Sequence, residues 1–327
     1  MEAASPLTTL SLLAFAGEPV QSMVHPAGPA AAEIASLWWI MFGAFTGVFV
    51  LVIVLMMYAI WWRPAPASAR EPAAPPGGRT GFIIAGGVVL PIVVLTPLFV
   101  YSLLASARLQ MPEDAQTIRV VGHMWWWEVR YPDHGIVTAN EIHIPAGEPV
   151  RLELTSADVI HSFWVPRLHG KRDMIPGIKT EFWIQADEPG VYRGQCGEYC
   201  GTQHANMALE VIALAPDDFA EWLKVQSQQR TQSESPAIDR GRQVFLTAGC
   251  KQCHAIEGTT ATGNAGPDLT HLGSRRMIGS ALLPNTAGNL AGWIADPQAL
   301  KPGVKMPRTY LEAEESQALV TYLESLK

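Results

Sequence analysis

Residues 196–207 read CGEYCGTQHANM, and this stretch decides the fold. It places two thiols, an imidazole and a thioether within a dozen residues, a soft ligand set that suits copper better than a hard cation. A blue-copper loop that holds one metal ion supplies a single Cys with His and Met, whereas the second thiol here lets both sulfurs bridge two copper ions. His161, which follows the strand-like run RLELTS at 151–156, offers a second imidazole.

Two other interpretations of this loop stay open. Cys196 and Cys200 could form a disulfide beside an incidental His, because an oxidising compartment permits disulfides. Alternatively, two Cys and two His could hold a structural zinc ion. Met207 and the surrounding strand pattern disfavour zinc.

The sequence around the loop alternates between apolar and polar residues. From Thr117 to Leu214, short runs rich in Val, Ile and aromatic residues are separated by Pro-Ala-Gly and Glu-Pro-Gly turns. This pattern predicts an antiparallel β-sandwich or barrel. Residues 217–225 then have helical spacing, and the polar stretch QSQQRTQSESP at 226–236 predicts a linker.

The chain has four cysteines, and the other two lie in the motif CKQCH at 250–254, the C-x-x-C-H pattern of covalent haem attachment. Its histidine can bind the iron, and Met306, in a Lys-Met-Pro sequence, is the candidate for the sixth ligand. The other methionine of this segment, Met277, lacks the following proline. A thioredoxin-like redox pair is the alternative, but the adjacent histidine and the missing βαβ pattern disfavour it.

Two stretches, Leu37–Trp62 and Gly81–Leu104, contain no Asp, Glu, Lys or Arg. Each exceeds the roughly 20 residues that cross a bilayer as a helix, although two buried helices of a soluble protein are the alternative. The connector Arg63–Thr80 carries three Arg against one Glu. The positive-inside rule therefore predicts that this connector is cytoplasmic and that both termini lie outside. Residues 1–20 form either a weak signal peptide or a loose tail.

The 327 residues include 23 Lys and Arg against 30 Asp and Glu, a formal charge of −7. Residues 106–225 hold 10 of the basic and 17 of the acidic residues, so this segment alone carries −7. The composition argues against collagen, disordered chains, disulfide mini-proteins and nucleic-acid binders. The acidic segment beside the near-neutral residues 238–327 fits docking of a cationic surface.

Together with DVIHSFWVP at 158–166, the cysteine loop resembles the binuclear copper A site of subunit II of cytochrome c oxidases. The resemblance covers about residues 30–225 and includes the two-helix hairpin and the aromatic run GHMWWW at 122–127. Residues 238–327 resemble a class I cytochrome c domain, in which GPDL at 266–269 matches the loop whose proline carbonyl hydrogen-bonds the haem-binding His. Copper-binding subunit II fused to cytochrome c is the organisation of the caa-type oxidases, and the whole chain resembles their subunit II.

The expected fold class is a multidomain membrane protein. Its predicted segments are an N-terminal outer segment (1–36), a two-helix transmembrane hairpin (37–105, with helices at about 37–62 and 81–104), an all-β cupredoxin-like Greek-key barrel (106–225), a linker (226–237) and an all-α class I cytochrome c domain (238–327, with helices at 237–247 and 312–326).

The resemblance implies a copper ligand set of two bridging thiolates, two imidazoles, a thioether and a backbone carbonyl: Cys196 and Cys200 as bridges, His161 and Met207 on one ion, and His204 with the carbonyl of Glu198 on the other. The Glu198 side chain is implied to bind a magnesium ion shared with subunit I. Trp125 is implied to receive electrons, with a packing role as the alternative. The haem c is implied to be held by Cys250 and Cys253, with His254 and Met306 on its iron.

The resemblance also implies a place in respiration. Electrons from a cytochrome c or a similar donor would pass through the haem c and copper A to a haem of subunit I, where oxygen is reduced to water and protons are translocated. The implied partners are subunit I, subunit III and the donor, in a bacterial-type plasma membrane with both redox domains on the periplasmic side. No oxygen-reducing site is evident in this chain, so the enzyme is a complex of which this subunit is an incomplete part. The fusion would make the donor intramolecular and raise its effective concentration through the linker.

One departure from the family pattern bears on the acceptor. Many relatives carry a glutamate seven residues before a proline near the start of the second transmembrane helix, whereas counting back from Pro91 reaches Ile84. Neither Phe82 nor Ile84 can carry protons. Either the partner subunit uses another proton entrance or the chain belongs to a divergent branch. The acceptor could then be nitric oxide, with this chain as the electron-transfer subunit of a copper A nitric oxide reductase. Two other classes also stay open: a membrane-tethered electron carrier without subunit I, and a copper-delivery or storage protein.

Overall fold

The computed structural model describes residues 21–62, 76–113, 115–228 and 235–327. The chain divides into two compact units, one formed by residues 32–110 and the other by residues up to 31 together with 111–327. The N-terminal tail, most of the predicted connector and the middle of the predicted linker lie outside the described residues.

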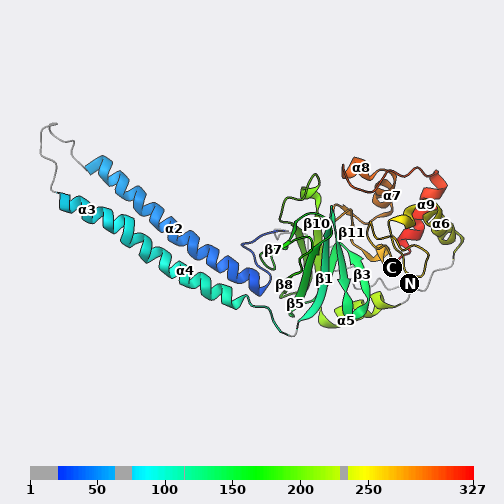
Figure 1. Cartoon of the computed structure of the whole chain (residues 1–327), viewed down its shortest axis with the longest axis horizontal. Coiled ribbons are helices and arrows are strands. Elements are labelled where there is room, and N and C mark those ends of the chain that lie inside the picture. Colours follow the sequence, from blue (N-terminus) through cyan, green and yellow to red (C-terminus); the bar gives the residue numbers. More distant parts are fainter. Residues whose placement is uncertain (1–20, 63–75, 114, 229–234) are drawn as a thin grey trace, which may run out of the picture. The chain divides into compact units, whose positions relative to one another are not determined.

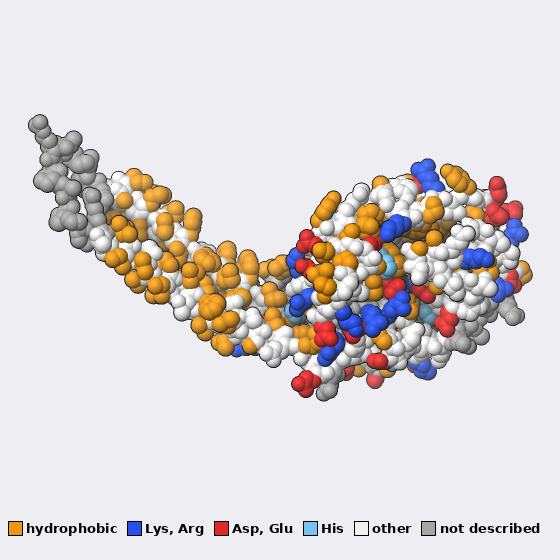
Figure 2. Space-filling model, viewed as in Figure 1, with side chains coloured by type: hydrophobic (Ala, Val, Ile, Leu, Met, Phe, Trp, Pro, Cys, Tyr) orange, Lys and Arg blue, Asp and Glu red, His pale blue; other side chains and the backbone are white. Residues whose placement is uncertain are grey.

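The first unit contains two helical stretches long and apolar enough to span a membrane, Pro29–Trp62 and Thr80–Arg108. The first is α2 (Pro29–Trp62). The second runs from the end of α3 (Pro76–Ile84) through the π-helical turn η2 (Ala85–Val89) into α4 (Leu90–Arg108). Their most apolar windows have mean hydropathies of 2.7 and 2.5, and none of those residues is buried inside the chain. Figure 2 shows hydrophobic side chains along both helices, whereas charged side chains gather on the other unit. A helix satisfies its own backbone hydrogen bonds, as a segment in hydrocarbon requires.

Both membrane helices differ from the prediction in detail. α2 begins at Pro29 rather than near 37. The prediction was based on a stretch without charged residues, so it left out the first turns of the helix, where Glu33 pairs with Arg108 at 3.2 Å. The second helix contains the π-helical turn η2 just before Pro91. Proline has no N–H to donate to the preceding turn, so the wider turn fits a helix that continues through it.

The second unit begins with two five-stranded sheets, ordered β3-β2-β1-β5-β8 and β4-β10-β9-β6-β7. The strands are β1 (Gln116–His123), β2 (Trp126–Tyr131), β3 (Ile136–Ala139), β4 (Glu141–Pro145), β5 (Val150–Ser156), β6 (His161–Trp164), β7 (Lys171–Met174), β8 (Thr180–Ile184), β9 (Gly190–Cys196) and β10 (Ala208–Leu214). Burial alternates along β5, as expected for a strand with one face on the core. The core holds Trp127 and Phe163, both fully buried, and helix α5 (Pro216–Ser227) adds Phe219 to it.

Not every strand pair is antiparallel, so that part of the sandwich prediction is wrong. β1 runs parallel to β5, with Gln116 opposite Val150, and β10 runs parallel to β4. Alternating burial identifies a strand but carries no information about the direction of its neighbour. These parallel pairs join strands that are not consecutive in the sequence.

The C-terminal segment folds around helices α6 (Pro236–Thr247), α7 (Ala287–Ala295), α8 (Pro297–Leu300) and α9 (Ala313–Glu324). α6 packs closely on α9, because a Cβ atom at Gly241 would lie only 2.0 Å from the carbonyl oxygen of Ala318. The segment is not purely helical, since β11 (Met277–Ile278) and β12 (Leu283–Pro284) form a short ribbon. The short 3-10 turns η5 (Cys250–Gln252) and η6 (Leu272–Ser274) complete it.

Candidate functional site

The cysteine loop lies where two neighbouring strands of one sheet come together. β6 starts at His161, β9 ends at Cys196, and the antiparallel pairing of these strands places Phe163 opposite Cys196. The loop then returns to β10, and the Cys196 amide donates a 2.8 Å hydrogen bond to the Met207 carbonyl. The sheet thus brings His161 next to a loop that follows it by more than thirty residues.

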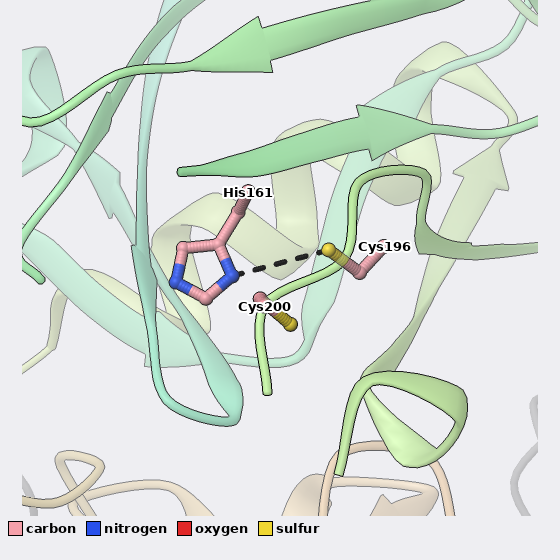
Figure 3. Close-up of side chains that lie close together, drawn as sticks. All are labelled: His161, Cys196 and Cys200. Carbon is pink, nitrogen blue, oxygen red and sulfur yellow. Dashed lines mark hydrogen bonds between the residues drawn. The ribbon is translucent and has the colours of Figure 1, made fainter. Parts of the chain in front are cut away.

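The side chains that the sequence singled out point at one another. The His161 ring faces the Cys196 sulfur, with Nδ1 3.9 Å from Sγ, and Cys200 lies beside them (Figure 3). One ligand atom from each of these three residues lies within 4.8 Å of the other two. All three are buried, with exposed fractions of 0% for His161 and 3% for each cysteine. A metal ion among them would be shielded from water.

Three further donor atoms complete the cluster around the sulfurs. Cys200 Sγ lies 3.7 Å from Met207 Sδ and 3.7 Å from His204 Nδ1. The backbone carbonyl of Glu198 lies 3.1 Å from Cys196 Sγ. The six expected donors therefore converge, and the set of two sulfurs, two imidazoles, one thioether and one carbonyl fits copper.

The two thiols influence each other strongly. The neighbouring Cys200 thiol lowers the pKa of Cys196 to about 3, against the opposing effect of burial, and the pKa of Cys200 is raised by the Cys196 sulfur. One thiolate therefore forms readily, which suits a site that binds a cation. Both cysteines are free thiols, as are Cys250 and Cys253.

Sequence reasoning missed two residues that hold His161 in place. Asp158 Oδ1 lies 2.9 Å from His161 Nε2, so Nδ1 is left facing the sulfurs. Burial alone would raise the pKa of Asp158, but hydrogen bonds from His161 and from the Met124 and Val159 amides outweigh it and lower that pKa. Behind the ring lies Gly122, where a Cβ atom would come within 2.8 Å of His161 Cδ2. The position of Asp158 three residues before His161 was the sequence signal for its role. No local sequence feature indicated the role of Gly122.

Trp125 and the Glu198 side chain lie at the edge of the cluster. Trp125 is partly buried, and its indole N–H donates a 2.9 Å hydrogen bond to the Cys200 carbonyl. The Glu198 carboxylate is 45% exposed and lies 3.4 Å from Lys171 Nζ. Its carboxylate is thus accessible but already paired within this chain.

The haem motif is built differently. His254 Nδ1 donates a 2.7 Å hydrogen bond to the Pro267 carbonyl, the bond that the GPDL resemblance implies. This bond leaves Nε2 available for an iron ion, and burial lowers the pKa of His254, which favours the neutral, ligating imidazole. At Gly266 a Cβ atom would lie 2.6 Å from His254 Cε1, so the absence of a side chain makes room for the ring.

The remaining haem candidates lie around the same small core. Cys250 and Met306 are partly buried against it, and Cys253 is exposed. Met277 instead lies in β11, and its amide donates to Glu141 of β4 at 3.1 Å. Two available thiols, an oriented histidine with space beside its ring and a methionine on the same core fit a covalently bound haem.

Comparisons with known proteins match two parts of the chain to two families. Residues 135–214 match the family described as "Cytochrome C oxidase subunit II, periplasmic domain", and residues 238–327 match "Cytochrome c". Cytochrome c oxidase subunit 2 of Alkalihalophilus pseudofirmus is 35% identical and covers 98% of this chain and 94% of its own. The protein of the same name from Bacillus sp. (strain PS3) is 34% identical, covering 73% of this chain and 72% of its own. The crystal structure of the periplasmic domain of subunit II of cytochrome oxidase from Bradyrhizobium japonicum is 32% identical, covers 36% of this chain and 96% of that one, and has a TM-score of 0.35.

Proposed function

The chain belongs to the cytochrome c oxidase subunit II family, and on that premise we propose that it passes electrons from a cytochrome c-like donor through a covalent haem c and a binuclear copper A centre to subunit I. Family membership itself implies copper A, a haem and association with subunit I of a haem-copper oxidase in a membrane. The observation that carries the finer proposal is the convergence of all six expected copper donors in one cluster, in which His161, both cysteines and Met207 are buried.

The copper roles follow from which atoms face the sulfurs. Cys196 and Cys200 would bridge both ions, because each sulfur lies between donors of both halves of the site. His161 and Met207 would complete one ion, and His204 with the Glu198 carbonyl the other. Bound copper supplies one-electron chemistry. The protein supplies a dry pocket and the Asp158 hydrogen bond that fixes the His161 ring.

The haem roles follow from the C-x-x-C-H turn. Cys250 and Cys253 would form the covalent links, His254 would bind the iron, and Met306 would be its sixth ligand. Met277 is a poor competitor for that sixth position, since β11 holds its backbone against Glu141. A haem with two protein ligands exchanges electrons and has no open position for oxygen.

The setting of the chain would be a bacterial-type plasma membrane. Helices α2 and α4 would span it, with the arginine-rich connector inside and both redox sites on the periplasmic side. Subunit III and an external cytochrome c would be further partners. The Glu198 carboxylate is paired with Lys171 in this chain. It would bind magnesium only at the interface with subunit I, where subunit I would supply the other ligands.

Electron paramagnetic resonance of the copper-loaded full chain tests the proposal. The centre is poised one electron short of full reduction, so that one unpaired electron is shared by two copper nuclei. Equal sharing between nuclei of spin three-halves gives seven hyperfine lines, which we expect. Four lines would show a site with a single copper ion and would overturn the bridging assignment, while haem staining of the denatured chain reports the covalent haem independently.

A further inference from the structure

Buried polar contacts join the β domain to the C-terminal segment along one interface. We call this interface the interdomain seam, and it contains from the β domain Trp125, Glu141, Arg193, Gln203, Ala208 and Glu210, and from the C-terminal segment residues 276–281 and 301–305. Both sides belong to the same compact unit.

Lys301 lies at the centre of the seam. It is only 1% exposed, and its ammonium donates 2.9 Å hydrogen bonds to the carbonyl oxygens of Trp125 and Gly279. The next residue, Pro302, accepts a 2.6 Å hydrogen bond from the Gln203 amide. A lysine is almost never fully buried unless it has partners, so this position requires the β domain to stay in contact.

A buried carboxylate forms the second anchor. Glu141 of β4 is 2% exposed and accepts hydrogen bonds from the amides of Arg276 and Met277 at 2.6 and 3.1 Å. Beside it, Glu210 of β10 pairs with the Arg276 guanidinium at 3.2 Å. The β-domain surface therefore presents two acids that have their partners on the other side of the seam.

The turn at 279–281 is shaped to fit this surface. Gly279, Ser280 and Ala281 all have positive φ angles, of 65°, 69° and 55°, which Ser and Ala rarely adopt. Ser280 donates a 2.7 Å hydrogen bond to the Ala208 carbonyl, and the Ala281 carbonyl accepts one from Arg193 at 3.1 Å. Strain of this kind persists where surrounding contacts hold it in place, and those contacts come from the β domain.

We propose that residues 235–327 are held permanently on the β domain by the interdomain seam, with Lys301 as the positioning residue for the loop that carries Met306. A segment that merely swings on a linker would have to break the contacts of Lys301, Glu141 and Glu210 together on each departure. Each hydrogen bond to a charged group contributes more than a neutral one, so their combined loss opposes separation. The fixed position thus replaces the tethered donor that the linker alone suggested.

The seam has a consequence for electron transfer, which rests on the proposed function. The loop at 301–306 contacts the copper site at two points: Lys301 on the carbonyl of Trp125, whose indole bonds the Cys200 carbonyl, and Lys305 at 3.5 Å from Asp158, which holds His161. Each contact is one residue away from a proposed copper ligand. The backbone of Trp125 is therefore held by the chain's own haem-bearing segment, which we expect to receive electrons from an external donor.

Cleavage of the linker in the full-length chain tests the proposal. Residues 229–234 are replaced by a protease recognition sequence, membranes carrying the haem-loaded and copper-loaded chain are cut, and the membranes are pelleted. Both membrane-spanning helices precede residue 109, so a haem fragment that does not hold to the seam leaves with the supernatant. We expect the wild-type fragment to stay in the pellet.

Two variants sharpen the readout. Lys301→Met leaves two buried carbonyls without a donor and should speed release of the fragment by roughly 10- to 100-fold. The matched control is Lys224→Met, because Lys224 is 64% exposed and pairs only with Glu221 of its own helix among the contacts described. Release of the wild-type fragment as fast as that of Lys301→Met would overturn the proposal, and so would equal retention of all three.

The retention of the haem fragment can be tested independently of the proposed function. Retention of the fragment is read from haem in the pellet and needs no electron transfer. If the uncut chain shows no transfer between haem and copper, the proposed function fails while the seam can still be confirmed. If transfer occurs but the cut fragment is released, the seam fails and the proposed function stands.

Discussion

The copper loop and the haem motif hold their ligands in different ways. The proposed copper donors come from the ends of β6 and β9 and from a loop closed onto β10, so the sheet positions them. The haem candidates lie in irregular chain, where His254 has a fixed partner in Pro267 but Cys253 is exposed. A site built on strands is preorganised, whereas a site built on loops gains its order from the cofactor that it binds.

The largest effect should come from removing one bridging sulfur. Cys196→Ser should abolish the seven-line copper signal, because one remaining thiolate cannot share the electron between two equivalent ions. Metal content per chain and the resonance spectrum measure this. Cys253→Ser is the counterpart in the other region and should cost a covalent haem link while the copper signal stays. A seven-line spectrum in Cys196→Ser would contradict the bridging role of Cys196 and, with it, the difference between the two regions.

The second test uses pH at the seam, away from both metal sites. Burial raises the pKa of Glu141 to about 7 from 4.5, with Glu210 raising it further and Arg275 and the amides of Met277 and Arg276 opposing this. A raised pKa in an acid means that attachment is strongest below pH 4.5 and weakens as pH rises from 4.5 to 7. The change should be about 3 kcal/mol. Above pH 7 the trend reverses, because burial lowers the pKa of Lys301 to about 7 from 10.5.

Retention of the cut haem fragment as a function of pH measures this dependence. Glu141→Gln should flatten the curve, because the amide keeps a hydrogen-bond acceptor but cannot ionise. The copper spectrum should not change over the same range. A wild-type curve that rises between pH 4.5 and 7 would contradict the assignment to Glu141.

The third test compares the two glycines that back the ligand imidazoles. Gly122→Ala places a methyl group 2.8 Å from His161 Cδ2 inside β1, where the sheet cannot yield, and should cost about 1–3 kcal/mol and shift the copper spectrum. Gly266→Ala places one 2.6 Å from His254 Cε1, but on a loop that can move. It should cost less stability and raise the high-spin fraction of the haem.

Urea unfolding of each domain, followed by its own chromophore, gives the two free energies. The matched control is Gly292→Ala in α7, where the added methyl group meets nothing within 4 Å. Equal losses at Gly122 and Gly266 would remove the distinction between a site on strands and a site on a loop.

The smallest effect should come from a helix cap in the haem-bearing segment. The Ser235 hydroxyl accepts a 3.2 Å hydrogen bond from the Ile238 amide at the start of α6. Ser235→Ala should lower the free energy of unfolding of this segment by about 1 kcal/mol and leave the copper domain unchanged. Thr321→Ala, inside α9, serves as a control. A loss seen equally in both domains would mean that they unfold as one unit.

Short motifs account for what the sequence predicted well. CGEYCGTQHANM brings five of the six expected copper donors close together in the chain, and only His161 had to be inferred from a separate motif. The haem motif CKQCH is likewise contained in five consecutive residues. The stretches without charged residues predict the membrane helices from composition alone. The ligand roles and the domain boundaries stay predictions.

Long-range contacts account for what the sequence did not reveal. Lys301 and Trp125 are 176 positions apart, and Arg276 and Glu141 are 135 apart, with no periodicity linking either pair. A lysine in a Gly- and Pro-containing loop is ordinarily solvated, so its burial could not be expected. The parallel pairing of β1 with β5 was hidden for the same reason, because strand alternation is independent of direction.

The parallel pair of β4 and β10 also sets an order of events during synthesis. β4 is an edge strand whose sheet neighbour is β10, so after Pro145 leaves the ribosome it waits until residues from Ala208 onward appear. Only then does the sheet close and present Glu141 and Glu210 on one surface. The last ninety residues emerge from the ribosome after β10, so the haem-bearing segment can fold against a completed β-domain surface.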